Sequence, residues 1–570
     1  MRAFIVLLAI VSYIFLAPDI LLAQTALDAD FNGNRSVDFP DFLEFAQAYG
    51  SDQSKYDLNR NGVVDFPDFL IFAQYYGETI AIVVFADSTL EAIIRDSISK
   101  PRGDILVDEV NGLTSLNIPK YNVGKAIKQL DGIENLKSLR QLNLYGHQRV
   151  GNISLLSELP SLVDLNLGYS DLRNISAISQ LDSVEILYLS GNSIDDLSPI
   201  SELHTLIELR LRSSGSTDIS PLSTLVKLEK LDVRSNIITD ISPLASLTLL
   251  TELELTENHI IDISPLAGLT LLKKLTLMSN KVSDISSLAG LTELRELNLI
   301  ANQILDISPL SSLVLLTTLG VGGNPLSDIS ALSGLYSLSG LNLQTAQISD
   351  ISALSTLASL TYLHLDNNQI SDISALSGLV GLTALTFDSN QISDIGPLSN
   401  LVNLERIDLR RNNIEDVSAL SNLHALSELP LAYNQIRDIS PLLSLSTLKI
   451  LRLDSNRIEH IQTLQGLSSL ESLGLENNQV QNIEFVLSAP SLKALYLGGN
   501  QISDISPLKQ LTTLERLRLS NNKVSDISAL VENEGVGSGD HISLDGNPLS
   551  DLALTTHIPA LQTRGVKIDK

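Results

Sequence analysis

A pattern of apolar and polar positions, 22 residues long, recurs along most of the chain. Its clearest copy runs from Leu291 to Ser312 and reads LTELRELNLIANQILDISPLSS. In this copy Asn302 separates a group of leucines from the isoleucines that follow. The asparagine position returns every 22 residues from position 170 to position 522. A fixed period of this length predicts a solenoid, in which each coil packs only against its neighbours.

The pattern within one copy predicts a strand, a turn and a short return segment. In the strand, Leu297 and Leu299 face inward on a period of two, so the residues between them face outward. We expect the side chain of Asn302 to bond backbone groups between adjacent coils, because a buried amide needs partners. The return segment has Asp306 to cap it and Pro309 near its first turn, and its length favours a 3-10 helix. The asparagine is replaced at four copies, where we expect weaker coil contacts: His147, Ser170, Ser214 and Ala346.

A helical cap is expected before the first coil. The segment VVFADSTLEAIIRDSI, residues 83–98, places Leu90, Ile93 and Ile94 on one stripe of an amphipathic helix. Such a helix covers the apolar layer that a first coil leaves open. With this cap, the chain from Val83 to Asp569 resembles the internalin-like bacterial leucine-rich repeat proteins. The resemblance implies an α/β fold, namely a leucine-rich repeat solenoid with a parallel sheet on its concave face and 3-10 or irregular returns on its convex side. It also implies adhesion or surface recognition of a protein ligand.

A short segment near the amino terminus is duplicated. DFNGNRSVDFPDFLEFAQAYG, residues 30–50, and DLNRNGVVDFPDFLIFAQYYG, residues 57–77, are the same segment twice. Ca²⁺ takes six to eight oxygen ligands, and loops with an oxygen at every second position followed by a carboxylate at a helix start supply them. The candidate ligands are Asp30, Asn32, Asn34, Ser36, Asp38 and Asp41 in the first loop, and Asp57, Asn59, Asn61, Val63, Asp65 and Asp68 in the second.

Two such loops, each followed by one helix, resemble the dockerin module, which is of the EF-hand type and is the calcium-binding half of the dockerin–cohesin pair. The resemblance implies a small all-α module with Ca²⁺ as cofactor and a cohesin-like partner. The chain departs from the dockerin pattern at Arg35, which stands where the turn favours Gly, and at the Phe-Pro pairs 39–40 and 66–67, which stand where dockerins usually display small polar residues. Its module also lies at the amino-terminal end. A calcium-stapled spacer without a cohesin partner is the alternative.

The amino terminus reads as a secretory signal, with Arg2, an apolar run and a small residue at Ala23. The apolar run is short for a membrane span, so we expect cleavage and a secreted or cell-surface protein. The expected organisation is a signal peptide at 1–23, the dockerin-like module at 28–79, the helical cap and a first irregular coil at 80–132, the repeat array at 133–548 and a carboxy-terminal cap at 549–570.

Composition excludes several functions. The formal net charge of -28 argues against nucleic acid and anionic lipid as partners, because binding phosphates needs a positive surface. The chain has no Cys, so neither disulfides nor thiolate sites are possible. Its eight His are scattered without a paired base or the spacing of metal ligands, and we expect no catalysis.

Recognition is therefore expected on the outward positions of the strands. Tyr and Arg anchor interfaces more often than other side chains do. They gather in the amino-terminal coils, which makes the candidate ligand-binding residues Tyr145, Tyr169, Tyr188, Arg210, Arg212 and Arg234. Ordinary surface variation in a long repeat explains the same residues equally well. The predicted function is that of a secreted, calcium-binding recognition protein. The alternative is a structural component of an extracellular assembly, docked through the dockerin-like module.

Overall fold

The structure is a computed structural model that describes residues 26–120, 125–147, 150 and 153–570. It consists of two units, the first ending at Leu172 and the second running from Arg173 to Lys570. The expected signal peptide lies outside the described residues.

The first unit begins with a small helical module. It contains α2 (Ala26–Ala29), α3 (Phe39–Ala48) and α4 (Phe66–Tyr75). Helices α3 and α4 both start with Phe-Pro, which suits a first turn because proline has no amide proton to satisfy. Aromatic rings fill the core between them: the Phe45 and Phe72 rings stack with centroids 5.7 Å apart, and Phe31 stacks on Phe72 at 5.8 Å.

The two halves of the module pair in the same way. Val37 of the first loop donates to the carbonyl of Glu78 at 2.9 Å and accepts from the amide of Gly77 at 2.7 Å. Val64 of the second loop forms the equivalent bonds with Ser51 and Gly50, both at 2.8 Å. Each loop is thus held by the segment that follows the helix of the other half, and the duplication seen in the sequence is a duplication of structure.

The predicted helical cap follows the module. The first unit continues through β1 (Ile82–Val83), α5 (Ser88–Ser97), β2 (Ile105–Leu106), α6 (Val107–Val110), β3 (Ser115–Asn117), η1 (Ile133–Asn135), β4 (Gln141–Asn143), η2 (Ile153–Glu158) and β5 (Asp164–Asn166). The Asp87 carboxylate caps α5 by accepting from the amides of Thr89 and Leu90 at 2.9 and 3.2 Å. Leu90 and Ile94 are fully buried, as the amphipathic stripe predicts. Strands β3, β4 and β5 are parallel and in register.

The second unit is a solenoid of parallel strands. Strands β6 to β16 form one sheet: β6 (Ile186–Tyr188), β7 (Glu208–Arg210), β8 (Lys230–Asp232), β9 (Glu252–Glu254), β10 (Lys274–Thr276), β11 (Glu296–Asn298), β12 (Thr318–Gly320), β13 (Gly340–Asn342), β14 (Tyr362–His364), β15 (Ala384–Thr386) and β16 (Arg406–Asp408). Strands β17 to β23 form another: β17 (Glu428–Pro430), β18 (Ile450–Arg452), β19 (Ser472–Gly474), β20 (Ala494–Tyr496), β21 (Arg516–Arg518), β22 (His541–Ser543) and β23 (Lys567–Asp569). The sheets separate at β17, where Pro430 lacks the amide proton that a ladder requires.

Short helices return the chain from one strand to the next. They are η3 (Ser176–Gln180), η4 (Ser198–Glu202), η5 (Ser220–Thr224), η6 (Ser242–Ser246), η7 (Ser264–Gly268), η8 (Ser286–Leu288), η9 (Ser308–Ser312), η10 (Ser330–Gly334), η11 (Ser352–Thr356), η12 (Ser374–Leu376), η13 (Gly396–Leu398), η14 (Ser418–Leu420), η15 (Ser440–Ser444), η16 (Glu484–Ser488) and η17 (Ser506–Gln510), all 3-10 helices. The end of the unit contains α8 (Ser528–Glu532), a π-helical turn η18 (Ala553–His557) and α9 (Ile558–Thr563). Ile558 and Leu561 of α9 are fully buried.

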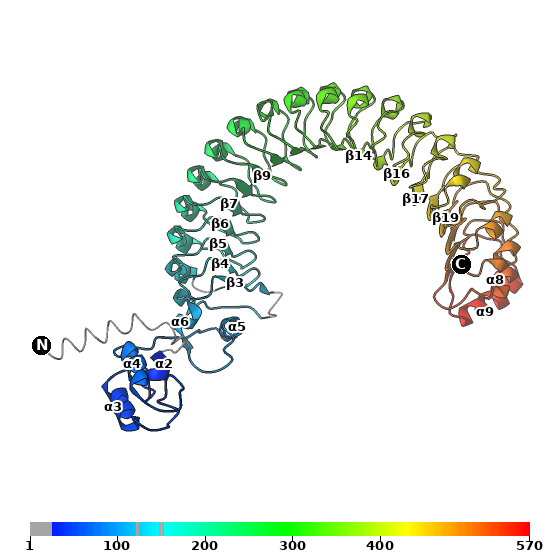
Figure 1. Ribbon diagram of the computed structural model, residues 1–570. Helices are drawn as coiled ribbons and strands as arrows, with labels where there is room; N and C mark the ends of the chain where they lie inside the picture. Colours follow the sequence, from blue (N-terminus) through cyan, green and yellow to red (C-terminus); the bar gives the residue numbers. More distant parts are fainter. Residues whose placement is uncertain (1–25, 121–124, 148–149, 151–152) are drawn as a thin grey trace. The chain divides into compact units, whose positions relative to one another are not determined.

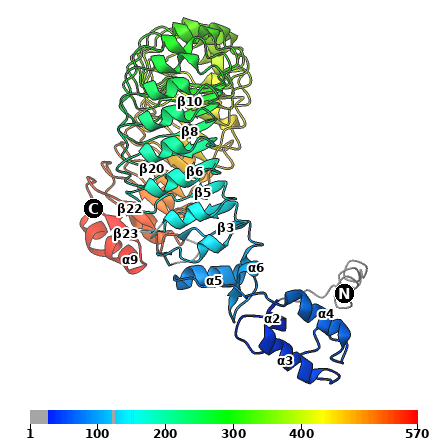
Figure 2. The same cartoon turned by 90° about the vertical axis from the view of Figure 1, so that its left-hand side faces the viewer.

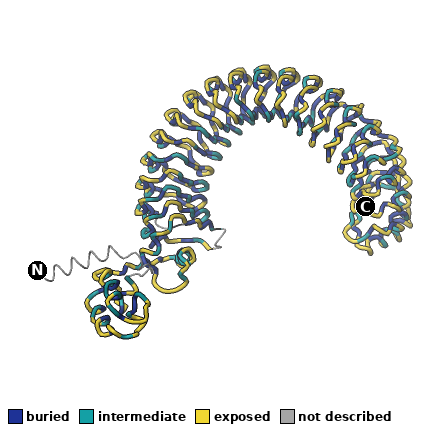
Figure 3. Tube along the Cα trace, viewed as in Figure 1, coloured by how far each residue is buried: buried dark blue, intermediate teal, exposed yellow. Residues whose placement is uncertain are grey.

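The strands of the second unit line the inner side of an arc and the returns line its outer side (Figure 1). Turning the view shows strands β6, β8 and β10 stacked one above another (Figure 2). The buried residues follow the interior of each coil, and the exposed residues follow the returns and loops (Figure 3). The leucine-rich repeat fold expected from the sequence is therefore confirmed. We call the outward-facing side chains of strands β6 to β23 the concave face.

A ladder of buried asparagines connects the coils. The Asn302 side-chain nitrogen donates to the carbonyl of Leu299 in its own coil at 3.0 Å and to that of Leu277 in the preceding coil at 2.9 Å. Its side-chain oxygen accepts from the amide of Val282 at 3.0 Å. The same three bonds are formed by Asn280 and by other buried asparagines of the series, such as Asn500.

The aspartates of the return segments cap them, as predicted. The Asp306 carboxylate accepts from the amide and the hydroxyl of Ser308, both at 2.8 Å. Equivalent bonds recur at exposed positions in the other coils, for example at Asp262 and Asp438. These carboxylates are structural, and they account for much of the net negative charge.

Replacements at the asparagine position differ in how they are compensated. The hydroxyl of Ser214 donates to the side-chain oxygen of Asn236 at 3.0 Å, so the serine stays within the ladder. His147 is completely buried: its Nδ1 accepts from the amide of Ile127 at 2.8 Å and its Nε2 bonds the carbonyl of Ile118. Ala346 carries no polar group and supplies none of these bonds. The predicted weakening therefore applies to Ala346 and not to His147 or Ser214.

We predict that Asn302→Ala lowers the free energy of unfolding by about 3 kcal/mol, because it leaves two carbonyls and one amide without buried partners. Ala346→Asn should raise it by about 1 kcal/mol by restoring the equivalent bonds. Urea unfolding followed by circular dichroism measures both changes. Gln303→Ala, at an exposed position beside Asn302, is the control and should leave the transition unchanged. A transition unaffected by Asn302→Ala would contradict the role given to the ladder.

The first unit should lose stability as pH falls, because of His147. Burial lowers the pKa of His147 below its usual 6.5, an effect that the nearby Lys120 strengthens and the Ile118 carbonyl and Asp87 oppose. Below about pH 6.5 the unfolded chain takes up a proton that the folded state resists, so unfolding becomes easier. Protection factors for the amides of Ile118 and Ile127, measured by hydrogen exchange, should fall between pH 7 and pH 5. His147→Asn should remove that dependence, and an unchanged dependence would contradict the assignment.

Candidate binding surfaces

The first loop of the module turns its polar side chains inward. The Asp30 carboxylate accepts from the amides of Gly33, Asn34 and Arg35 at 2.9, 3.1 and 2.8 Å. Asn32 and Asn34 each accept from the amide two residues further on, at 2.9 and 2.8 Å. These bonds order the loop so that oxygens at alternate positions face its interior.

The second loop repeats this geometry. Asp57 accepts from the amides of Asn61 and Gly62 at 3.1 and 2.7 Å, and Asn59 and Asn61 bond the amides two residues on, both at 2.9 Å. Gly62 is left-handed with φ 94°. Arg35, which stands at the same position in the first loop, adopts φ 68°. The arginine therefore makes the turn that glycine makes, at the cost of some backbone strain.

The carboxylates that close the two loops are oriented alike. Asp41 accepts from the amides of Asn32 and Asp38 at 3.0 and 2.9 Å, and Asp68 accepts from those of Asn59 and Asp65, both at 2.8 Å. Asp41 and Asp68 are completely buried. Burial, the main cause, raises the pKa of Asp68, and the negative charge of Asp57 raises it further.

One oxygen in each loop has no protein partner. The Oδ1 atoms of Asp38 and Asp65 are buried and accept no hydrogen bond. Among the described residues no three His, Cys, Asp or Glu side chains form a metal-binding group by themselves, and each loop relies on Asn side chains and backbone carbonyls as well. All of these donors are oxygens, which is the ligand type that Ca²⁺ takes. A bound cation would also compensate the buried carboxylate oxygens that have no hydrogen-bond partner.

The module also carries an apolar groove. A cavity of about 380 Å³ is lined by Phe39, Phe42, Phe69, Phe72, Ala73 and Tyr76. Phe39 and Phe66, the aromatic residues of the two Phe-Pro pairs, are 57% and 50% exposed. Large aromatic side chains at these exposed positions are unusual for the surface of a monomer.

The six predicted ligand-binding residues fall into two parts. Tyr145 and Tyr169 belong to the first unit, where their rings lie 5.2 Å apart. Tyr169 does not lie on a strand: it occupies a left-handed turn position with φ 55° after β5. Tyr188, Arg210, Arg212 and Arg234 belong to the second unit and lie on or directly after strands β6, β7 and β8.

Two of these arginines pair with carboxylates that are not among the predicted ligand-binding residues. The Arg210 guanidinium lies 4.4 Å from the centroid of the Tyr188 ring and pairs with Glu208 at 2.6 Å. Arg234 forms two bonds with Asp232, at 2.7 and 2.9 Å. In contrast, the exposed side chain of Arg212 forms no ion pair within the described part of the chain.

The charges of this region compensate one another. A shallow cavity of about 210 Å³ is lined by four cations and four anions: Arg210, Lys230, Arg234, Lys274, Glu208, Asp232, Glu252 and Glu254. Lys230 pairs with Glu252 at 2.7 Å and Lys274 with Glu254 at 2.8 Å. Glu208, Asp232 and Lys274 occupy outward positions of the strands. The two-residue period of a strand therefore identifies them in the sequence when all outward positions are considered. The patch is not a positive surface.

A second cavity, of about 340 Å³, lies at the middle of the concave face. Strands β10 to β14 line it with Lys274, Thr276, Glu296, Leu297, Asn298, Ile300, Thr318, Leu319, Gly320, Asn342, Tyr362 and His364. The glycines in this region look bare in the sequence, but neighbouring side chains cover them. A β-carbon at Gly340 would stand 2.0 Å from the Tyr362 ring, and one at Gly320 would stand 2.9 Å from Ile300.

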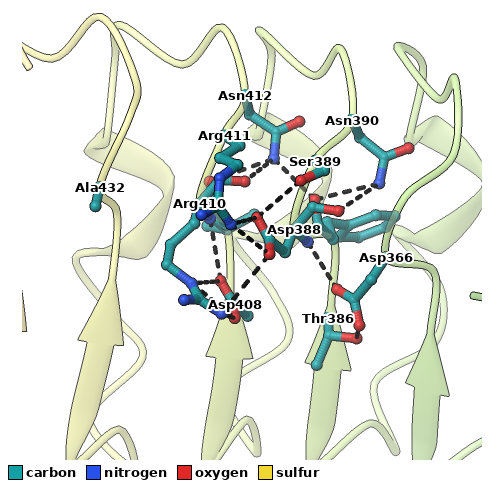
Figure 4. A network of polar contacts seen from close by, with 12 residues as sticks. Asp366, Thr386, Asp388, Ser389, Asn390, Asp408, Arg410, Arg411, Asn412 and Ala432 are labelled. Carbon is teal, nitrogen blue, oxygen red and sulfur yellow. Dashed lines mark hydrogen bonds and ion pairs between the residues drawn. The ribbon is translucent and has the colours of Figure 1, made fainter. Parts of the chain in front are cut away.

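Beyond this cavity, acidic and basic side chains form a network on β14 to β16 and the turns after them (Figure 4). Arg410 binds Asp408 through two nitrogens, and Arg411 binds both carboxylate oxygens of Asp388 at 3.1 and 2.9 Å. The Asp366 carboxylate accepts from the Thr386 hydroxyl and the Asp388 amide, both at 2.7 Å. Burial is the main cause that raises the pKa of Asp366.

One Ser, His and Asp lie together at the carboxy-terminal end. Asp569 accepts from the Ser543 hydroxyl at 3.3 Å and pairs with His541 at 2.5 Å. The serine hydroxyl donates to the carboxylate and not to the imidazole, so these three residues lack the serine–imidazole bond by which a histidine activates a serine nucleophile. Separately, none of the helices in the described residues has the length and apolarity that crossing a membrane takes.

Comparison with known proteins agrees with this architecture. The family model described as leucine rich repeats in two copies matches residues 226–268, 270–312, 358–400, 380–422, 402–444 and 490–532. A search of curated proteins found no match.

Solved structures resemble the chain over longer stretches. An internalin (inlF) from Listeria monocytogenes is 37% identical, with 58% of this chain and 98% of that chain covered and a TM-score of 0.56. A leucine-rich repeat protein of Leptospira interrogans is 24% identical over 74% of this chain and 98% of its own, with a TM-score of 0.55. The plant peptide hormone receptor RGFR1, in complex with RGF2, is 18% identical over 80% and 95%, with a TM-score of 0.58. The last two show the fold alone.

Proposed function

The chain belongs to the internalin-like leucine-rich repeat proteins, and we propose that it recognises a protein ligand through the concave face of its second unit. The observation that carries the proposal is the contrast between the two sides of the solenoid. On the outer side the return segments repeat the same Asp and Ser positions from coil to coil. On the concave face the outward residues differ from coil to coil and form two cavities.

The chemistry of the concave face suits a protein ligand. Arginine and tyrosine side chains stand among carboxylates and amides, which is the mixture that protein interfaces use. Because most of the cations are already paired with carboxylates, the surface offers pairs of opposite charges and hydrogen-bonding groups rather than a strong net charge of one sign. Neither cavity contains a nucleophile with a base, and we expect the protein to act by binding and not by catalysis.

We propose that both module loops hold Ca²⁺. The support is the set of inward oxygens at equivalent positions, together with the unpaired Oδ1 atoms of Asp38 and Asp65. The ligands in the first loop would be Asp30, Asn32, Asn34, the carbonyl of Ser36 and Asp41, with Asp38 acting directly or through water. In the second loop they would be Asp57, Asn59, Asn61, the carbonyl of Val63, Asp68 and Asp65. The ion would tie each loop to the start of its helix, and no reaction is assigned to it.

A second function is favoured by the apolar groove of the module. Phe39 and Phe66 are exposed at the positions where the dockerin resemblance expects partner contacts, and the exposed Tyr76 lines the same groove. A cohesin-like partner bound there would make the chain a component of an extracellular assembly. Export follows from the signal-like segment 1–23, and we propose it for either function.

Recognition is tested with the full chain and a library of random peptides displayed on phage. Peptides selected by the natural protein should lose binding to a concave variant that combines Arg210→Ala, Arg234→Ala and Tyr362→Ala, by about tenfold or more. Arg437→Ala with Lys509→Ala, which removes two cations outside the concave strands, is the matched control. If the selected peptides bind the concave variant and the natural protein equally, concave recognition is wrong. Peptides that lose binding only to the double variant Phe39→Ala, Phe66→Ala would favour assembly through the module instead.

Calcium binding is tested by titration calorimetry of the full chain with CaCl₂. We expect two sites, and we expect Asp41→Asn and Asp68→Asn to weaken one site each, because each removes a charged ligand. Asp52→Asn removes an exposed carboxylate from the segment between the repeats and is the control. Heat exchange that is absent, or that is the same in all three variants, would contradict the proposal.

A further inference from the structure

The cavity in the middle of the concave face has a chemical character of its own. It extends over five strands, β10 to β14, and is larger than the charged cavity next to it. Its walls combine the Tyr362 and Ile300 side chains with hydroxyl and amide groups of Thr318, Asn298 and Asn342. We infer that this cavity binds an extended peptide segment through one basic and one apolar side chain, a conclusion that rests on the proposed concave recognition.

Glycines create the hollow. At Gly340 the absence of a side chain allows the Tyr362 ring to lie over the neighbouring strand, because a β-carbon there would stand 2.0 Å from the ring. At Gly320 the Ile300 side chain occupies the equivalent space. The rings of Tyr362 and His364 lie 5.8 Å apart and close one end of the cavity. An apolar ligand side chain finds aromatic and aliphatic surface at this end.

The opposite end carries a carboxylate that forms no ion pair within the described residues. Glu296 is exposed, and its side chain forms no hydrogen bond or ion pair within the described residues. The nearest cation of the lining, Lys274, pairs with Glu254 on its other side at 2.8 Å. Lys274 stands opposite Glu296 in the strand register, but its pKa is raised mainly by its bond to Glu254 and less by the charge of Glu296. Among the described residues, Glu296 is thus the carboxylate of the lining that forms no ion pair, whereas the adjacent patch has its charges paired. A lysine or arginine side chain is the complementary group.

A further carboxylate supports the same sign of charge. Asp366 follows His364 by two residues on the same face and accepts hydrogen bonds from Thr386 and Asp388 without an arginine or lysine partner. The whole chain carries a formal net charge of -28, which draws a basic ligand toward it and repels an acidic one.

The register of the strands sets the spacing of the two ligand side chains. Glu296, Thr318, Gly340 and Tyr362 are consecutive partners across β11, β12, β13 and β14. Three strand intervals of ~4.8 Å separate the backbones of Glu296 and Tyr362 by about 14 Å, and the Tyr362 ring, which lies over Gly340, is one interval nearer to Glu296. An extended peptide advances ~3.3 Å per residue, so the basic and apolar side chains should stand about three to four residues apart. The peptide would run across the strands, along the concave face.

The experiment uses the phage-displayed peptides selected on the full chain. Binders that lose affinity for the concave variant should contain a lysine or arginine about three to four residues from an apolar residue. Synthetic copies of these peptides should bind Glu296→Gln and Tyr362→Ala at least about tenfold more weakly than the natural protein. Glu296→Gln keeps the shape of the side chain, so a loss cannot be ascribed to misfolding. Glu293→Gln removes an exposed carboxylate from the same coil outside the cavity and should bind as the natural protein does.

Replacing the basic residue of the peptide by glutamine should weaken binding as much as Glu296→Gln does. The two changes together should weaken binding no more than either change alone. Peptides that need the concave face yet bind Glu296→Gln and Tyr362→Ala normally would overturn this site and leave concave recognition intact. Selected peptides without basic residues would overturn it as well. If no selected peptide is sensitive to the concave variant, both proposals are wrong.

Discussion

The asparagine ladder is the constraint on which the rest of the solenoid depends. Each buried amide satisfies two carbonyls and one amide that belong to two successive coils, as Asn302 does with Leu299, Leu277 and Val282. A buried backbone group without a partner is costly, so a coil that gains residues stays stable when the asparagine keeps its bonds. The segment before Asn547 shows this: the period lengthens, but Asn547 still donates to Leu519 at 2.8 Å and accepts from Val524 at 3.0 Å. The extra residues are accommodated outside the ladder.

A ladder of this kind leaves only the outward positions free to vary. The contacts that an outward side chain forms then depend on its neighbours in the adjacent coils. Strands ~4.8 Å apart bring side chains 22 residues apart in sequence into contact. Near β7 to β10 the result is charge compensation, with Lys230 bound to Glu252 and Lys274 to Glu254. Near β12 and β13 the result is a hollow, because glycines allow Tyr362 and Ile300 to lie over the sheet. The same scaffold thus produces a neutral charged surface and a cavity within a few coils.

The amino-terminal module follows a different principle, in which two copies of one segment support each other. Val37 and Val64 each pair with the segment after the opposite helix, and the Phe45 and Phe72 rings stack between the halves. The closing carboxylates Asp41 and Asp68 are buried, and Asp38 and Asp65 each keep an oxygen without a protein partner. Burying several carboxylates in so small a module is unfavourable without compensating charge, which is the physical reason for proposing calcium there.

The sequence by itself determined the period, the strand and return of each coil, the inward leucines, the capping aspartates and the duplication of the module. These features depend on residues close in the chain or on equivalent positions of adjacent coils, so one repeat predicts the next. It also identified Tyr188, Arg210 and Arg234 as outward residues, but it did not reveal that Glu208 and Asp232 neutralise the arginines. Only the tertiary structure decided which outward side chains pair, that Tyr169 stands on a turn, and that the apparently bare glycines form a cavity. The reason is that these outcomes depend on the directions in which side chains from different coils lie, and a linear pattern does not contain those directions.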